Sequence, residues 1–302
     1  MCAAQNNDSV ADPPSSDRSG WLFRQGRLEE AIDAASAAVR LAPRSAPARI
    51  LLAEMLLFNG AFERADTILA AAEAIDVSMG LVVAEFRQLL RAEQARQQVR
   101  REGRLPEFLN EPTLSLNHSL KALTLLRAGD TDAAAVAAEE AEAARPRVAG
   151  SHDGTPFDDF RDVDDLCGGF IEVLTTTGRY FWVPVEQIDT ATFHPRQRLR
   201  DLFWRRCSMT LREGPDGDVY VPALYVNFPM SVPEPFPAVS ELHDASEPGD
   251  IGMQARLRIG QATEWSRTAP VRGHGQRLFL AGEEALAMQD LAELVIGPAS
   301  VT

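Results

Sequence analysis

The stretch Gly178-Arg179-Tyr180-Phe181-Trp182-Val183-Pro184 sets three aromatic side chains in a row, directly after a Thr-Gly pair that can turn the chain. Aromatic and β-branched residues favour strands, so the sequence predicts a strand over residues 179–185. A similar run over 169–176 lies on the other side of the turn, and the two are expected to form a hairpin. Because large aromatic side chains bury much apolar area, we expect this hairpin to anchor the core of a β-rich domain.

Short strands separated by turns continue outward from this hairpin. The patterns predict a second hairpin from 207–212 and 219–224, and further strands over 254–259, 277–280 and 291–296. A short helix is expected over 195–204, and four prolines predict a loop over 229–237. Short strands with few helices indicate a small α+β domain with a partly open β-barrel.

Helical repeats precede this domain. The segment Gly26-Arg27-Leu28-Glu29-Glu30-Ala31 is echoed 34 residues later by Gly60-Ala61-Phe62-Glu63-Arg64-Ala65. This offset is the period of tetratricopeptide repeats, which are pairs of helices joined by a tight turn. A third copy begins at Gly129, and helical patterns over 81–101 and 119–126 lie between the second copy and the third. We therefore predict an array of helical hairpins over residues 21–146.

An array of this kind usually binds a peptide or a helix in a groove, but the protein's own second domain can also fill that groove. Both alternatives stay open from the sequence. The predicted organisation is a disordered tail over 1–20, a tetratricopeptide-like repeat domain over 21–150 and an α+β domain over 155–297. Pro, Gly, Ser and His residues over 147–157 indicate a linker between the two domains.

The composition narrows the class of protein. A formal net charge of −14 and a pI near 4.9 argue against nucleic acid as the main partner, because phosphate binding needs a basic surface. Three cysteines without CxxC spacing suggest a reducing compartment. The first 20 residues lack the basic and apolar regions of a signal peptide, and the chain has no run of eighteen apolar residues. These features predict a cytoplasmic protein.

Candidate catalytic and metal motifs are weak. The acidic run over 158–165 resembles a calcium loop, but Leu166 and Val173 stand where such a loop needs oxygen ligands. We favour a solvated acidic turn, or one that pairs with nearby arginines. The five histidines lack zinc-site spacing, the glycine-rich segment 273–277 lacks nucleotide-binding spacing, and no serine lies in a G-x-S-x-G setting. No metal or cofactor is therefore predicted.

Tryptophans and arginines are the candidate contact residues. Trp182, Trp204 and Trp265 could form a binding platform, but a domain of this size needs large aromatic residues in its core, and we favour the core. Arginines close to aromatic residues can stack on them or pair with the acidic run. The arginines in such positions are Arg179, Arg200 and Arg277.

The second domain resembles the ImpE/TagJ family (also called SciE), accessory proteins of the bacterial type VI secretion system. Leu224 and Gln261 depart from the family pattern, because an arginine usually occupies both places. The resemblance rests on five motifs in order, namely Asp162-Val163-Asp164-Asp165-Leu166-Cys167-Gly168 with Glu172, then 178–184, Leu199-Arg200-Asp201-Leu202-Phe203-Trp204, Thr263-Glu264-Trp265 and Gly273-His274-Gly275-Gln276-Arg277.

This resemblance implies a non-catalytic adaptor. Such a protein is expected to bind the N-terminal helix of the small contractile-sheath subunit and to link the sheath to the AAA+ ATPase that disassembles it. One rival hypothesis is a generic helical-repeat scaffold. Another is an enzyme that uses the carboxylates of Asp162, Asp164 and Glu172. If the second domain holds the partner helix, the expected contact residues are Arg179, Arg200, Trp265 and Arg277.

Overall fold

The computed structural model describes residues 18–226 and 249–297. The proline-rich loop predicted over 229–237 and most of the predicted tail over 1–20 lie outside these residues. The helices are α1 (Arg18–Arg24), α2 (Leu28–Leu41), α3 (Ala46–Phe58), α4 (Phe62–Ile75), η1 (Val77–Met79), α5 (Gly80–Glu102), α6 (Leu114–Arg127), α7 (Thr131–Ala144), η2 (Val185–Gln187), η3 (Leu199–Leu202) and α8 (Gly249–Arg258).

The helix ends follow local chemistry. The Ser45 hydroxyl accepts the Ala48 N–H at 3.3 Å and starts α3, and Asp130 caps α7 in the same way at 3.1 Å. Gly26 and Gly60 adopt φ values of 75° and 67°, which only glycine reaches without strain. These are the glycines of the 34-residue repeat, and they make the tight turns of the α1–α2 and α3–α4 hairpins.

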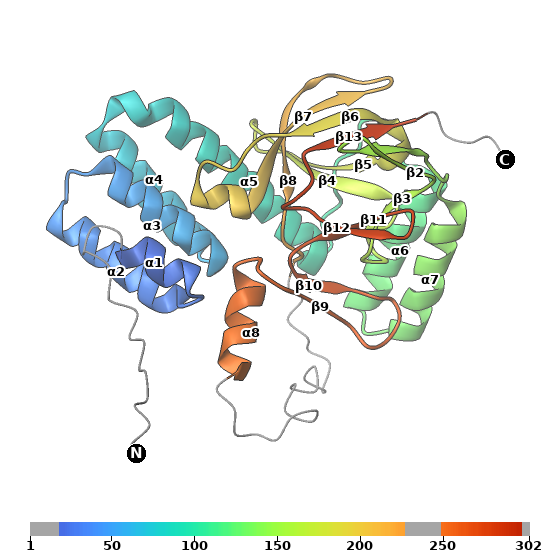
Figure 1. Ribbon diagram of the computed structural model, residues 1–302, viewed down its shortest axis with the longest axis horizontal. Helices are drawn as coiled ribbons and strands as arrows, with labels where there is room; N and C mark the ends of the chain where they lie inside the picture. The colour runs from blue at the N-terminus through green and yellow to red at the C-terminus, as the bar shows by residue number, and fades with distance from the viewer. Residues whose placement is uncertain (1–17, 227–248, 298–302) are drawn as a thin grey trace, which may run out of the picture.

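The helices lie on two sides of the strands and do not form one continuous array (Figure 1). Helices α1–α4 and the first half of α5 share one apolar core. Helices α6 and α7 pack against each other on the far side of the molecule, where they share a core with the end of α5 and with Trp182. The predicted array over 21–146 is therefore interrupted after α5, although its third hairpin exists.

The strands are β1 (Gly150–His152), β2 (Thr155–Phe157), β3 (Phe160–Asp162), β4 (Phe170–Thr175), β5 (Tyr180–Pro184), β6 (Ile188–Phe193), β7 (Trp204–Leu211), β8 (Gly217–Pro222), β9 (Thr263–Trp265), β10 (Gly273–Gly275), β11 (Leu278–Ala281), β12 (Glu284–Ala287) and β13 (Glu293–Ile296). Eight of them form one antiparallel sheet in the order β2-β1-β13-β6-β7-β8-β4-β5. Smaller sheets are β12-β11-β3 and β10-β9.

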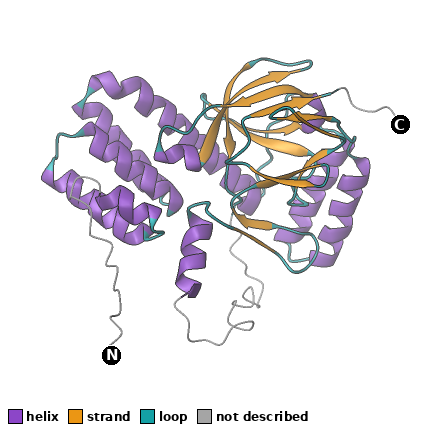
Figure 2. Ribbon diagram, in the orientation of Figure 1, coloured by secondary structure: helices purple, strands orange, loops and turns teal. Residues whose placement is uncertain are grey.

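Both predicted hairpins are present. In the first, β4 pairs with β5 and places Glu172 opposite Trp182. In the second, β7 pairs with β8. The large sheet ends at β2 and β5 rather than closing on itself, in line with the partly open barrel that was predicted. Figure 2 shows these strands between the two groups of helices.

Three local predictions differ from the structure. Residues 254–258 of the strand predicted over 254–259 belong to helix α8, which ends at Arg258. Leu257 and Ile259 are both buried near the end of this helix, and this alternation imitates that of a strand. The helix predicted over 195–204 shrinks to the four residues of η3, after which Trp204 begins β7. The predicted linker over 147–157 contains β1 and β2, which join the large sheet.

Helix α5 is the element that connects the parts. It is 23 residues long and contributes buried side chains to the core of α1–α4 and to the core of α6–α7. Its C-terminal end is closed by Gly103, whose φ of 87° gives the left-handed turn that commonly ends helices. The two hollows of the candidate site described below border this helix.

Candidate partner-binding site

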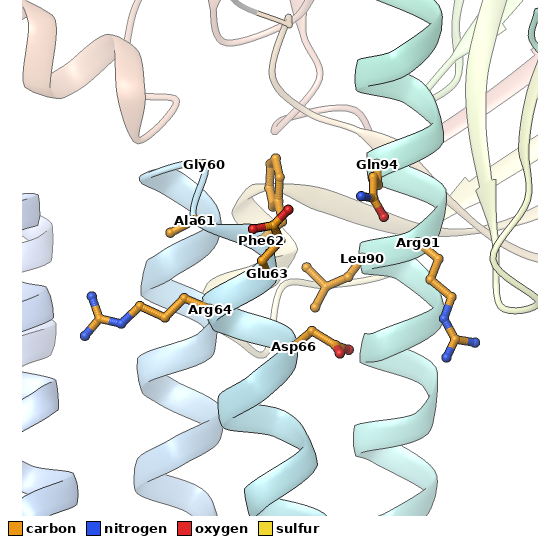
Figure 3. A pocket seen from close by; sticks show the side chains of 9 residues that line it. All are labelled: Gly60, Ala61, Phe62, Glu63, Arg64, Asp66, Leu90, Arg91 and Gln94. Atoms are coloured by element: carbon orange, nitrogen blue, oxygen red, sulfur yellow. The ribbon is translucent and has the colours of Figure 1, made fainter. Parts of the chain in front are cut away.

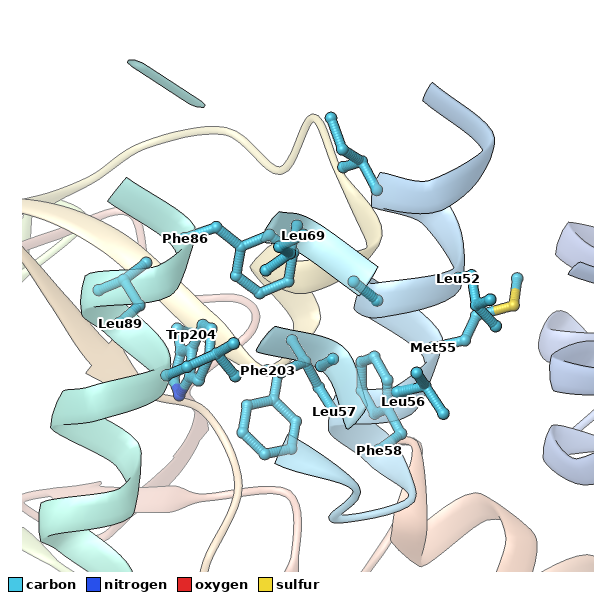
Figure 4. Packing of buried hydrophobic residues seen from close by; sticks show 14 of the residues in the cluster. Leu52, Met55, Leu56, Leu57, Phe58, Leu69, Phe86, Leu89, Phe203 and Trp204 are labelled. Atoms are coloured by element: carbon cyan, nitrogen blue, oxygen red, sulfur yellow. The ribbon is translucent and has the colours of Figure 1, made fainter. Parts of the chain in front are cut away.

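The face that the repeat helices α3 and α5 would offer to a ligand is covered by this chain itself (Figure 4). Phe203 packs edge-on against Phe58 of α3 with ring centroids 5.3 Å apart. Trp204 packs against Phe86 of α5 at 6.1 Å. Of the two alternatives left open for the groove, the structure therefore supports filling by the second domain.

A buried cluster of charged side chains joins the other half of α5 to the sheet. Glu172 of β4 is completely buried and accepts hydrogen bonds from Arg96 at 3.0 Å and from Arg100 at 2.9 Å. Arg277 and the Tyr180 hydroxyl donate to the same carboxylate. Burial alone would raise the pKa of Glu172, but the guanidinium groups of Arg100, Arg96 and Arg277 outweigh it and hold the pKa well below its usual range.

The two aspartates of the D-x-D motif lie beside this cluster. Asp162 accepts from the Tyr225 hydroxyl at 2.7 Å and forms an ion pair with Arg277 at 3.4 Å. Burial raises its pKa to about 6, although Arg277 opposes the rise. Asp164 accepts from the backbone N–H groups of Leu166 and Gly273, at 2.9 and 3.0 Å. It therefore fixes the loop between β3 and β4 to strand β10.

The three carboxylates of the enzyme hypothesis thus lie close together, but in the core. All are at most 6% exposed, and their partners are arginines, tyrosine hydroxyls and backbone N–H groups of the same chain. Their arrangement is that of an ionic core that ties α5 and β4 to Arg277, the residue before β11. Arg96 and Arg100 complete it and were not found from the sequence. A possible signal was the spacing of Glu93, Arg96 and Arg100 on one face of a predicted helix.

The structure does not bring the four predicted contact residues to one surface. Arg277 is 0% exposed, and Arg200 is 6% exposed, bound to Glu85 at 2.8 Å. Both side chains therefore bind groups inside the protein and do not lie on its surface. Arg179 is exposed, stacks over Phe181 and pairs with Glu107. Trp265 is half-buried and packs against Tyr225 at 5.8 Å.

An open groove lies between the start of α4 and the middle of α5 (Figure 3). This α4–α5 groove has a volume of about 630 Å³. Phe62 and Leu90 supply its apolar part, and charged side chains surround them, in the pattern of a protein-binding groove with an apolar centre and a polar rim. The charged residues are Glu63, Arg64, Asp66 and Arg91.

A second hollow continues the groove along α5. This junction cavity, about 460 Å³, shares Gly60 and Phe62 with the α4–α5 groove and is also lined by Gln97, Leu257 and His274. It lies where α3, α5, α8 and β10 meet. From Leu90 to Arg101 the two hollows follow α5 for about 16 Å, which is the length of three turns of a helix.

Neither a metal site nor a membrane-spanning helix is seen in the part of the chain that is described. Within residues 18–226 and 249–297, no three acidic, histidine or cysteine side chains are grouped so that they could hold a metal ion. No helix in these same ranges is long and apolar enough to cross a membrane.

Comparison with known proteins gives matches to both parts of the chain. A family model described as ImpE protein matches residues 154–295. A tetratricopeptide repeat model matches residues 22–78, the region of α1–α4. The type VI secretion system accessory component TagJ of Pseudomonas aeruginosa is 31% identical over 278 residues, which cover 92% of this chain and 90% of that protein.

The fold also has a solved counterpart. A crystal structure of a protein from Vibrio parahaemolyticus matches with a TM-score of 0.79, covering 93% of this chain and 97% of the other. The sequence identity is 24%, so this likeness speaks for the fold alone. It covers both the repeat helices and the sheet.

Proposed function

The chain belongs to the ImpE/TagJ family, and from this premise we propose that it is a non-catalytic accessory protein of the type VI secretion system. Its partner in this proposal is the N-terminal helix of the small contractile-sheath subunit. The proposal places the protein in the cytoplasm and has it link the sheath to the AAA+ ATPase that disassembles contracted sheath.

One observation carries the binding part of this proposal. The hollow along α5, made of the α4–α5 groove and the junction cavity that shares Gly60 and Phe62 with it, is about as long as three turns of a helix. Its apolar floor and charged rim suit the apolar stripe and polar flanks of an amphipathic helix. The face of α3 and α5 is already occupied by Phe203 and Trp204, so the proposal assigns the partner to this hollow.

The rival hypotheses have less support. Of the carboxylates that an enzyme would use, Glu172 and Asp162 are paired with arginines inside the core, and Asp164 accepts from backbone N–H groups. A generic repeat scaffold would share the hollow but would not bind the sheath subunit in preference to other amphipathic helices. Binding to a scrambled peptide of the same composition separates the scaffold from the adaptor.

A titration tests the proposal directly. A fluorescently labelled peptide from the N-terminus of the small sheath subunit is titrated with the full chain, and anisotropy is recorded. We expect saturable binding that Gln94→Trp weakens at least tenfold, because an indole on this exposed position of α5 obstructs the α4–α5 groove. Val136→Trp, on the exposed face of α7, is the matched control and should bind normally.

A flat titration with folded protein would overturn the proposal. Two further variants, Arg179→Ala and Trp265→Ala, test the predicted contact residues that keep exposed surface. If they weaken binding and Gln94→Trp does not, the helix binds the sheet region instead of the hollow along α5.

A further inference from the structure

A further groove of the repeat helices lies apart from the hollow along α5. It has a volume of about 660 Å³ and runs between α2 and α3, beside the start of α1. Figure 1 shows α1 and α2 at the end of the molecule opposite α6 and α7. This α2–α3 groove shares no lining residue with the α4–α5 groove or the junction cavity. Apolar side chains make up much of its wall, among them Leu22, Ala34, Ala37, Ala38, Ala48 and Leu51.

An exposed leucine stands at the edge of this groove. Leu41 is the last residue of α2 and lines the groove, and at 88% it is the most exposed large apolar side chain of the described residues. A projecting leucine beside an apolar groove leaves water only when another molecule covers both. The surface thus offers a projecting part and a hollow part, as a surface that binds a copy of itself does.

The groove residues of α2 form one face of this helix. Glu30, Ala34, Ala37 and Leu41 follow the spacing i, i+4, i+7 and i+11. The alanine side chains are small, so a second helix can approach this face closely. The shape and the composition of the groove therefore favour a helix as its occupant.

Two opposite charges lie along one flank of this face. Asp33 and Arg40 are both exposed and are seven residues apart, which places them within about 20° of each other around the helix axis. Neither side chain forms an ion pair within residues 18–226 and 249–297. An occupant that complements them carries a cation near Asp33 and an anion near Arg40, two helical turns further on.

An antiparallel second copy of α2 has this charge pattern. When a two-fold axis passes between positions 36 and 37, position 33 of one copy lies level with position 40 of the other, on the same flank. Asp33 of each copy then pairs with Arg40 of the other copy. Leu41 comes level with Ile32 of the second copy, beside Ala34 in the groove. One symmetry operation therefore places both the charges and the exposed leucine.

We propose that the α2–α3 groove is the interface of a two-fold symmetric homodimer, in which α2 of one copy packs antiparallel to α2 of the other. This inference goes beyond the proposed function and does not depend on it. A chain with a net charge of −14 repels its own copies at long range, so oppositely charged pairs are needed to orient the contact. Such a dimer carries two hollows along α5, which raises its avidity for a partner that presents several copies of one helix.

The mass of the full chain in solution is the first test. In sedimentation equilibrium we expect the mean mass to rise from 33.0 kDa towards twice this value as the protein concentration increases. A mass that stays at 33.0 kDa up to about 1 mM would overturn the proposal, because specific interfaces associate below this concentration.

Reversing the two charges tests the antiparallel pairing. Asp33→Arg and Arg40→Asp should each weaken dimerisation about tenfold, because each places like charges opposite each other at both symmetric contacts. An equimolar mixture of the two variants should regain the wild-type affinity as a heterodimer, since every flank position of one variant then faces the opposite charge of the other. A mixture that is no more dimeric than either variant alone would refute the pairing of α2 with α2.

The exposed leucine has a matched control. Leu41→Gln should weaken dimerisation at least tenfold, because it removes the apolar side chain that enters the groove of the second copy. Leu81→Gln changes a leucine of α5 that is 84% exposed and lies outside the α2–α3 groove, and it should leave dimerisation unchanged. Thermal melts by circular dichroism check that both variants are folded. Equal dimerisation of the two variants would place the interface on another surface and overturn the proposal.

Discussion

The two halves of α5 meet the sheet region in opposite ways. Its first half packs Phe86 against Trp204 in an apolar core. Its second half inserts Arg96 and Arg100 beside Glu172, in a core of charged groups. One helix is thus attached at one end by apolar area and at the other by an ionic network.

The two junctions between α5 and the sheet region should respond differently to amino-acid substitutions. An apolar junction loses stability in proportion to the area and volume removed. A buried ionic junction depends on charge balance, since removing one partner leaves the others charged and desolvated. The network is also directional, and it fixes the register of α5 on β4 in a way that apolar packing does not. We therefore expect substitutions in the ionic junction of α5 to be tolerated less well than substitutions in the apolar junction.

The largest expected effect comes from Glu172→Gln. The substitution keeps the volume but leaves Arg96, Arg100 and Arg277 without their shared counter-charge. We expect the free energy of unfolding to fall by about 3–5 kcal/mol. Urea denaturation followed by circular dichroism measures it. A loss below about 1 kcal/mol would show that the arginines do not depend on this carboxylate and would remove the contrast between the two junctions.

A smaller loss is expected for Trp204→Phe in the apolar half. Phenylalanine keeps most of the ring packing but removes the indole N–H, which donates to Glu93 at 3.0 Å. One buried acceptor is left short of a bond, and the loss should be about 1–3 kcal/mol in the same denaturation assay. If this variant is less stable than Glu172→Gln, the order of the two junctions is reversed.

Glu54→Gln tests a third contact between the repeat helices and the sheet region. Here the substitution is expected to raise the stability of the protein rather than lower it. Glu54 is buried on α3, and burial raises its pKa from 4.5 to about 7, although Arg200 and Arg198 oppose the rise. The folded state binds this proton more tightly than the unfolded state, so Glu54 lowers stability as the pH rises from about 4.5 to about 7.

Glutamine imitates the protonated form of this side chain. We therefore expect Glu54→Gln to raise the free energy of unfolding by about 1–2 kcal/mol at pH 8 and to change it little at pH 5. Thermal melts of both proteins across this range measure the difference. A variant that is destabilised at pH 8 would show that the charged form of Glu54 is stabilised by the arginines of η3 and its flank.

The smallest effect is expected at the surface. Arg179 pairs with Glu107, but its side chain is 58% exposed. Arg179→Ala should leave the free energy of unfolding almost unchanged, because solvent screens exposed ion pairs. The same melts show it. A larger loss would mean that the contact between residue 107 and strand β5 depends on this pair.

Local patterns were enough to predict several elements. Both hairpins, the helix over 81–101 and the repeat glycines Gly26 and Gly60 were found because turn residues and hydrophobic periods are local. The β1–β2 hairpin was missed, although Asp153-Gly154 is a recognised turn pair. Helix α8 was missed because its short pattern imitates a strand.

The candidate site depended on contacts that no local pattern contains. Arg96 meets Glu172 across 76 positions, and Phe203 reaches Phe58 across 145. Motif order identified Glu172 and Arg277 as a set, but not whether they lie in the core or on the surface. The junction cavity joins Gln97 and His274, which belong to different domains of the prediction. Only the folded chain brings them together.

The position of strand β13 means that the large sheet is completed late in synthesis. It is the last described element, yet it lies between β1 and β6 within the large sheet. As the ribosome makes the chain from the N-terminus, the repeat helices can fold early. The β1–β2 hairpin has no strand to attach to until residues 293–296 emerge. A ribosome stalled before this point therefore carries a nascent chain whose sheet is still in two pieces.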